Sequence, residues 1–176
     1  YSMAHFGVFV GATQSEGYCF VERIRHYAAH NVAGTSLPGP HTGVGGLLSV
    51  VCGRVSYMFG MQGPSMCVDT ACSASLVATH IASVALADSE CDQFVSAGVS
   101  ITVGMFSYAG IAAASMSSTD GRCKTLDILA DGYGKGECCG VVQATVPKAE
   151  MSTETLNQSA LLIGSGVNQD GRSSSL

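Results

Sequence analysis

The chain of 176 residues is largely apolar, with 47% hydrophobic residues, only 12% charged residues and a net charge of −5. Soluble domains carry about 25% charged residues, so this composition predicts a chain that is buried within a larger domain or against a large partner surface. The sequence has no Lys/Arg cluster, which argues against nucleic-acid and anionic-lipid binding, and no apolar run reaches the roughly 20 residues that span a bilayer.

Apolar patterning and turn residues predict strands that alternate with helices along the chain. Strands are expected at 6–13, 66–71, 91–102, 141–147 and 160–168. Helices are expected at 15–33, 47–60, 73–87 and 103–119, and the Gly/Pro-rich stretch 34–46 is expected to be a loop. The helix over 73–87 has apolar residues all round, which predicts a buried helix. This alternation favours an α/β architecture.

Eight cysteines raise the question of disulfides, metal binding or catalysis. No C-x-x-C pair occurs, so the zinc-ribbon and zinc-finger patterns are absent and no metal site is expected. The first residues have no basic flank and do not resemble a signal peptide. We therefore expect free thiols in a reducing compartment, the cytoplasm or an organelle, and most of the eight as small buried side chains.

Cys72 differs from the other cysteines because it lies where a strand is expected to meet the helix over 73–87. A helix N-terminus offers unpaired N–H groups and a positive dipole end, which favour a thiolate and can hold an oxyanion. The small neighbours Ala71 and Ser73 leave room for a substrate. These features leave two interpretations open, a nucleophile and a structural cysteine. No G-x-S-x-G pattern offers a competing nucleophile, and the glycine-rich stretch 132–140 lacks phosphate-loop spacing.

Several ordered motifs around Cys72 carry a resemblance to a known family. The stretch "GPSMCVDTACSASLVATHIA" (63–82) resembles the active-site signature of β-ketoacyl synthases, in the form found in modular type I polyketide synthases. Downstream, "GRCKTLDILADGYGKGE" (121–137) and "GSGVNQDGRSSS" (164–175) resemble two further motifs of that family, and 7–13 and 42–60 follow the family's order. The departures from the family pattern are Ala74, Thr119, Cys138 and Ser174–Ser175, which affect loop shape and substrate preference.

The resemblance implies a thiolase-like layered α/β fold, α-β-α-β-α in the parent domain, of which this chain supplies mostly the N-terminal half. It implies that residues 1–176 are a partial ketosynthase domain that lacks the start of the domain and the C-terminal half with two catalytic histidines. It assigns Cys72 as the nucleophile that accepts an acyl chain, with its backbone N–H in the oxyanion hole. The acyl chain then undergoes decarboxylative Claisen condensation with a malonyl-carrier thioester. No cofactor is expected beyond the phosphopantetheine arm of the acyl carrier protein.

The resemblance also implies partners. These are the acyl carrier protein and a second copy of the chain, paired through the region around Pro64–Thr70. Two alternatives to a condensing enzyme stay open, a non-condensing acyl-transfer domain and a structural dimerisation domain.

Other polar residues near these motifs have more ordinary explanations. His80 lies eight residues after Cys72, about 12 Å along a helix, so we expect a core or second-layer histidine. We expect Asp69 to bind backbone amides of a turn. The charged residues of the second motif are expected to form an ion-paired loop scaffold: Arg122, Lys124, Asp127, Asp131 and Glu137. The remaining histidines are expected on the surface or in loops: His5, His26, His30 and His41.

Overall fold

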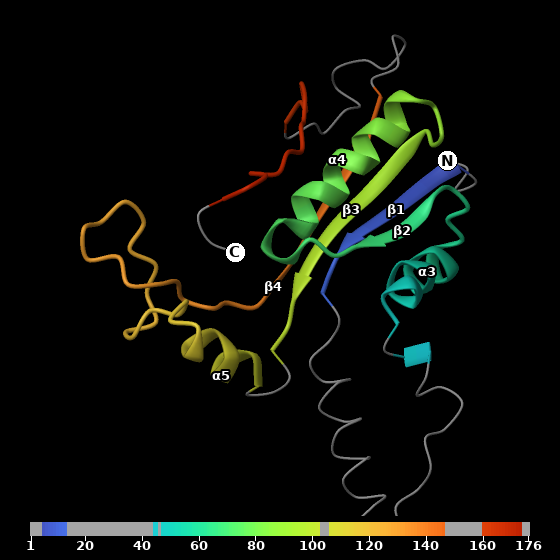
Figure 1. Ribbon diagram of the computed structural model, residues 1–176. Coiled ribbons are helices and arrows are strands. Elements are labelled where there is room, and N and C mark those ends of the chain that lie inside the picture. Colours follow the sequence, from blue (N-terminus) through green and yellow to red (C-terminus); the bar gives the residue numbers. More distant parts are fainter. Residues whose placement is uncertain (1–4, 14–43, 46, 103–105, 147–159, 174–176) are drawn as a thin grey trace, which may run out of the picture.

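The computed structural model describes residues 5–13, 44–45, 47–102, 106–146 and 160–173 (Figure 1). Its strands are β1 (Phe6–Gly11), β2 (Ser65–Val68), β3 (Gln93–Ser100) and β4 (Cys138–Thr145). Its helices are α3 (Leu48–Phe59), the short 3-10 turn Ala71–Ser73, α4 (Ala74–Ala87) and α5 (Phe106–Ala113). The helix expected at 15–33 lies outside the described residues.

The four strands form one mixed sheet in the order β2-β1-β3-β4. β1 pairs in parallel with both β2 and β3, and β4 runs antiparallel to β3. In this register Gly11, at the end of β1, stands directly opposite Gly98 of β3. Parallel neighbours need crossover connections, and α3 and α4 supply helices for them. The expected α/β architecture is therefore confirmed for the described residues.

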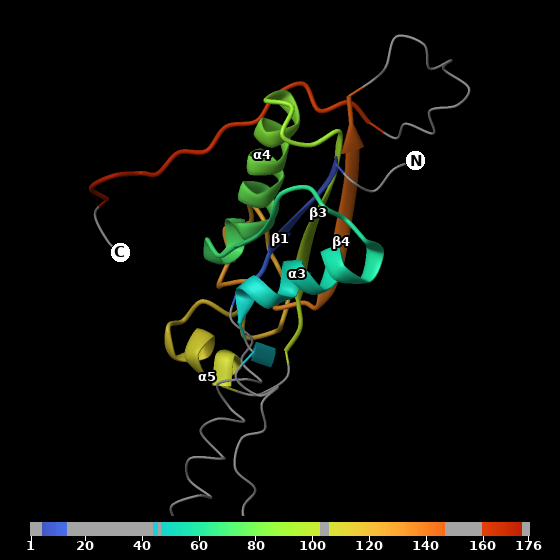
Figure 2. The same ribbon diagram turned by 90° about the vertical axis from the view of Figure 1, so that its right-hand side faces the viewer.

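The two long helices cover opposite faces of the sheet, as Figures 1 and 2 show. Successive side chains of a strand point to opposite faces, so β1 serves both layers. Phe9 packs in the cluster with α4, whereas Val8 and Val10 pack in the cluster with α3. All six residues of β1 are buried, as expected for a central strand between two helix layers.

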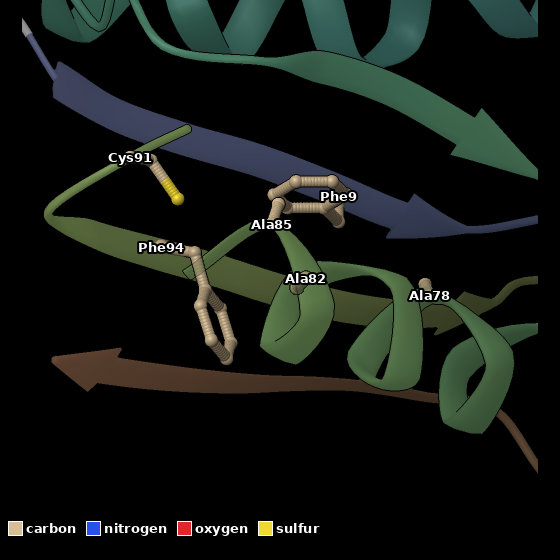
Figure 3. Packing of buried hydrophobic residues seen from close by; sticks show 6 residues of the cluster. All are labelled: Phe9, Ala78, Ala82, Ala85, Cys91 and Phe94. Atoms are coloured by element: carbon tan, nitrogen blue, oxygen red, sulfur yellow. The ribbon is translucent and has the colours of Figure 1, made fainter. Parts of the chain in front are cut away.

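The face of α4 that meets the sheet consists of small side chains. Every three or four residues an alanine is buried, at Ala74, Ala78, Ala82 and Ala85. Figure 3 shows three of these alanines beside Phe9 and Phe94, whose rings meet edge to face with centroids 6.2 Å apart. Small residues let the helix axis approach the sheet closely, and the two rings fill the space that remains.

The opposite face of α4 corrects the expectation of a helix buried on all sides. Leu76 is 75% exposed and Val84 is 44% exposed. The apolar residues around the helix are thus buried against the sheet only on the alanine face. The outer face of α4 thus exposes apolar side chains at Leu76 and Val84.

The expected strand at 160–168 is wrong for the structure. Residues 160–173 contain no strand, and Ile163 is 93% exposed. The stretch has a β-rich composition, but a strand also needs a neighbouring ladder to satisfy its backbone groups, and these residues pair with no strand in the described chain. The helix expected at 103–119 is shorter in the structure, where α5 spans Phe106–Ala113.

Candidate active site

Cys72 lies on the connection between β2 and α4, as the sequence predicts. β2 ends at Val68, and the 3-10 turn Ala71–Ser73 leads directly into α4. The side chain of Cys72 is exposed, which excludes the interpretation as a buried structural cysteine. Within the described residues nothing bonds to the Cys72 backbone N–H, so this donor remains open beside the thiol.

Local hydrogen bonds fix the shape of this connection. An oxygen of the Asp69 carboxylate accepts from the N–H of Ala71 at 3.1 Å, which confirms the expected amide-binding role of Asp69. Ser73 donates its backbone N–H to the carbonyl of Thr70 at 3.3 Å, and its hydroxyl lies 2.9 Å from both the carbonyl and the hydroxyl of Thr70. Ala71 adopts φ +53°, the left-handed region that costs a residue with a Cβ about 1–2 kcal/mol. The turn that presents Cys72 is thus both strained and held by several bonds.

Two glycines of the sheet allow the start of α4, which follows Cys72, to approach the sheet closely. A Cβ on Gly11 would lie 2.4 Å from backbone atoms of Ala74 and Ser75. A Cβ on Gly98 would lie 2.5 Å from the Cβ of Ser75. Gly11 and Gly98 are paired in the sheet, so together they form a surface without side chains. The first turn of α4 packs on this surface. The sequence analysis missed this pair, although a glycine inside a strand pattern signals a close backbone approach.

The other thiols lie in different surroundings from Cys72. Desolvation raises the pKa of Cys67 to about 11, and the neighbouring Cys52 thiol adds to the effect. Burial likewise raises the pKa of Cys91. A raised pKa reduces the thiolate fraction at neutral pH and therefore the reactivity of the thiol. All seven described cysteines are free, as expected.

The expectation that most cysteines are buried is wrong for the described residues. Only Cys52 and Cys91 are buried there, while four cysteines are exposed: Cys72, Cys123, Cys138 and Cys139. Cys138 and Cys139 lie on β4, whose residues are exposed except at its C-terminal end. A small apolar side chain therefore does not by itself place a cysteine in the core of this chain.

The histidines do not supply a partner for the Cys72 thiol within the described chain. His80 lies in the middle of α4, and its Nδ1 atom is 2.8 Å from the hydroxyl of Ser165. The side chain of His80 is half-buried, so it does not lie in the core, one of the two positions expected for it. His5 is exposed, as expected, and three histidines lie outside the described residues: His26, His30 and His41.

The second motif forms a loop that is organised by one lysine between two carboxylates. Lys124 Nζ lies 2.9 Å from Asp131 and 3.3 Å from Asp120. The hydroxyl of Ser118, which is 8% exposed, lies 2.8 Å from Asp131 and 2.6 Å from Asp120. Thr119 donates both its backbone N–H and its hydroxyl to Asp131. The expected ion-paired scaffold is confirmed for Lys124 and Asp131, and the sequence analysis missed Asp120.

The remaining charged residues of this motif form hydrogen bonds that involve backbone N–H groups. Asp127 accepts from the N–H of Leu129 at 2.8 Å. Glu137, next to β4, accepts from the N–H of Thr102, which follows β3. Neither residue approaches Cys72 through any described contact. Arg122 uses its backbone N–H, which donates to Asp120 at 3.2 Å.

This loop is expected to loosen in acid. Hydrogen bonds from Lys124 lower the pKa of Asp131, and a hydrogen bond from Ser118 lowers the pKa of Asp120. Because these pKa values are lower in the folded chain, the stabilisation is complete above the ordinary carboxyl pKa of about 4 and is lost as the pH falls below it. The amide resonance of Thr119, recorded by NMR from pH 6 to about pH 1, should shift at the low end. Asp131→Asn should remove this titration, whereas the control Asp127→Asn should preserve it; an unchanged titration in Asp131→Asn would contradict the assignment.

The parts of the chain that the structure describes contain neither a metal-ligand cluster nor a helix that could cross a membrane. No three His, Cys, Asp or Glu side chains there come together as ligands for a metal ion. Of the helices described, none combines the length and the apolar character that a membrane crossing needs. The candidate site therefore consists of Cys72, its turn and the glycine pair below it.

Comparison with known families agrees with this arrangement. The family model described as "Beta-ketoacyl synthase, N-terminal domain" matches residues 2–143. A phenolphthiocerol/phthiocerol polyketide synthase of Mycobacterium tuberculosis is 36% identical over 171 residues, which are 97% of this chain and 8% of that protein. The non-reducing polyketide synthase pks11 of Talaromyces marneffei is 41% identical over 124 residues, 70% of this chain and 5% of that protein.

Solved structures give the same result. An oxazolomycin ketosynthase domain from Streptomyces albus JA3453 superposes with a TM-score of 0.63 and 35% identity, over 79% of this chain and 23% of that one. The ketosynthase from module 6 of the bacillaene synthase of Bacillus subtilis 168 superposes with a TM-score of 0.62 and 31% identity, over 80% of this chain and 21% of that one. The chain belongs to the β-ketoacyl synthase family and has the thiolase-like fold of ketosynthases. More particularly, it is a portion of a ketosynthase domain of the modular polyketide synthase kind.

Proposed function

We propose that this chain carries the nucleophile of a β-ketoacyl-[acyl-carrier-protein] synthase, an acyltransferase of polyketide or fatty acid biosynthesis. The observation that supports the proposal most directly is the position of Cys72. Its exposed thiol and open backbone N–H lie together on the strained turn at the start of α4. A nucleophile and an oxyanion donor are the two groups that acyl transfer to a thiol requires.

In the first step the Cys72 thiolate attacks the thioester carbonyl of an acyl chain on the phosphopantetheine arm of the carrier protein. The carbonyl oxygen becomes an oxyanion, and the Cys72 N–H donates to it. The C–S bond to the pantetheine then breaks, so the acyl group stays on Cys72 and the pantetheine leaves as a thiol that takes up a proton. No oxidant, reductant or metal takes part in this exchange of one thioester for another.

In the second step a malonyl-carrier thioester loses carbon dioxide, and the resulting carbanion attacks the Cys72 thioester and releases the Cys72 thiol. In the family this step depends on two histidines in H-G-T-G-T and N-I-G-H contexts, and neither motif occurs in the 176 residues. We therefore assign to residues 1–176 the acyl-accepting part of a ketosynthase domain, and condensation to the whole protein. The chain alone is expected to stop at acyl-Cys72.

Acylation of the chain by a short acyl thioester of N-acetylcysteamine tests this assignment. We expect mass spectrometry of the digested chain to place the acyl group on Cys72, because the thiols of Cys67 and Cys91 have raised pKa values. Cys72→Ala removes the sulfur that accepts the acyl group, so no acyl group should be found at position 72 and acylation of the chain should fall to the level of the other thiols. Cys123→Ala, which removes another exposed thiol, is the control and should leave the rate of acylation at Cys72 unchanged. Acyl groups found on other cysteines, with Cys72 free, would refute the nucleophile.

The two alternatives give different results in the whole protein. A condensing enzyme releases carbon dioxide and forms a β-ketoacyl product from acyl-Cys72 and a malonyl carrier. A non-condensing acyl-transfer domain forms acyl-Cys72 and no β-ketoacyl product, and a purely structural domain forms neither. The exposed thiol favours an acyl-accepting domain, condensing or non-condensing, over a purely structural one.

We also propose a homodimer that forms through the region around Pro64–Thr70. β2 lies at one edge of the described sheet, so its outer side can pair with another strand. Next to it, the C-terminal turn of α3 exposes large apolar side chains, with Tyr57 at 87% and Phe59 at 61% exposure. The free thiols among the described cysteines fit a reducing compartment, and we place the protein in the cytoplasm.

A further inference from the structure

Residues of α4 and of the distant segment 160–173 meet in a small hydrogen-bonded cluster. His80 Nδ1 lies 2.8 Å from the hydroxyl oxygen of Ser165. The same Ser165 oxygen lies 3.1 Å from the hydroxyl oxygen of Ser83, one turn further along α4. Ser83 in turn donates its hydroxyl proton to the backbone carbonyl of His80 at 2.7 Å. The three side chains and the backbone carbonyl of His80 thus form a closed loop of contacts.

The number of hydroxyl protons in this cluster determines the direction of each hydrogen bond. A serine hydroxyl has one proton, and Ser83 uses its proton for the carbonyl of His80. The contact between the two hydroxyls must therefore be donated by Ser165. With its proton used in this way, Ser165 can only accept from the ring of His80. The Nδ1 atom of His80 must then carry a proton, which leaves Nε2 as the basic nitrogen of the neutral ring.

This cluster attaches the segment to α4. The segment contains no helix or strand, and its apolar side chains remain exposed, with Leu161 at 70% and Ile163 at 93%. Burial therefore contributes little to holding it. Figures 1 and 2 show the segment near the C-terminal half of α4, from which it extends away.

We propose that His80, in the Nδ1–H form, is a positioning residue that anchors the segment 160–173 to α4 through Ser165. The anchor sets where the "NQDGR" motif of this segment begins relative to the helix that follows Cys72. Sequence alone places His80 only in the motif around Cys72 and gives it no partner. The inference goes beyond the proposed acyl transfer, because it concerns the placement of a second motif and involves no reaction at Cys72.

The tautomer of His80 is the direct test. In the chain labelled with 15N, two-bond correlations from the imidazole carbons distinguish a protonated Nδ1 from a protonated Nε2 at pH 8. We expect Nδ1–H for His80. The variant Ser83→Ala removes the acceptor of the Ser165 proton, so Ser165 can then donate to Nδ1 and the Nε2–H form should become populated. An Nε2–H form in the unmodified chain, or a tautomer that Ser83→Ala leaves unchanged, would overturn the proposal.

Substitutions of His80 test the anchor itself. Asparagine can place an amide donor where Nδ1 stands, whereas the amide of glutamine lies one methylene further out. The backbone order parameter of residue 165, measured by 15N relaxation, is expected to stay near 0.8 in the unmodified chain and in His80→Asn. It should fall below about 0.6, the range of flexible segments, in His80→Gln and Ser165→Ala.

Two controls make this result interpretable. Unshifted amide resonances of β1 and β3 in every variant show that the sheet is intact. The variant Thr79→Ser keeps a hydroxyl at the neighbouring helix position and should not affect residue 165. Equal order parameters in His80→Asn and His80→Gln would refute the anchor. None of these measurements uses the Cys72 thiol, so failure of the anchor and failure of the acyl-transfer proposal are distinguishable.

Discussion

Gly11→Ala is expected to destabilise the chain by about 3 kcal/mol or more, the upper part of the range for overpacked cores. The added Cβ would lie 2.4 Å from the backbone carbon of Ala74 and the backbone nitrogen of Ser75. Backbone atoms cannot rotate away as a side chain can, so α4 would have to lift from the sheet or β1 would have to move. Lifting α4 would disrupt the core cluster that its alanines form with Phe9 and Phe94. Moving β1 would disrupt both clusters, because β1 is buried along its whole length and contributes side chains to each.

Urea unfolding followed by circular dichroism measures this effect, and the chain contains a matched control. A Cβ on Gly53, inside α3, would meet no atom within 4 Å. Gly53→Ala should therefore stabilise the chain by about 0.5–1 kcal/mol, the helix-propensity difference between the two residues. Gly98→Ala should resemble Gly11→Ala in sign and size, because the Cβ of Ser75 that it meets at 2.5 Å is held in place by the backbone of α4. Equal midpoints for Gly11→Ala and Gly53→Ala would show that the glycine pair does not support α4.

The same glycine pair shows which part of the site the sequence could not predict. The motif around Cys72 indicates the nucleophile and the strand-to-helix connection, because small residues and apolar periodicity are local signals. The contact of Gly11 with Ser75 depends on the register between β1 and β3, and register is a property of the folded sheet. The positive φ of Ala71 is likewise unpredictable from an alanine, since that residue has no preference for the left-handed region.

The elements that the sequence predicted wrongly have a common physical cause. Composition indicates how apolar a segment is, but not which neighbour covers it. The stretch 160–168 has the residues of a strand and pairs with no strand in the described chain. The helix α4 has apolar residues all round, but only its alanine face meets the sheet. Cys138 and Cys139 are exposed for the same reason, because β4 is the other edge of the described sheet.

Ser65→Pro is expected to convert the proposed homodimer into a monomer. The carbonyls of Pro64 and Val68 accept from the N–H groups of Val8 and Ala12, at 2.8 Å and 3.1 Å. Because backbone groups alternate in direction along a strand, the N–H of Ser65 points away from β1 toward the free edge. A second β2 strand that pairs there needs this donor, whereas the contact with β1 does not. Proline therefore removes a hydrogen bond of the proposed interface and leaves the sheet of one chain intact.

Light scattering coupled to size-exclusion chromatography measures the change against the chain mass of 18.0 kDa. By symmetry each dimer loses two hydrogen bonds, at about 1 kcal/mol each, and also gains two proline rings at the contact, so the dissociation constant should rise at least tenfold. Ser65→Ala is the control: it removes the hydroxyl that accepts from Ser56 at 2.9 Å but keeps the backbone donor, so it should remain dimeric. If Ser65→Pro dimerises as tightly as Ser65→Ala, or if the unmodified chain is monomeric at every concentration, β2 is not the interface. Loss of the dimer only in Ser65→Pro would mean that two copies join through the strand that leads into Cys72, so dimerisation and the position of the nucleophile would depend on the same strand.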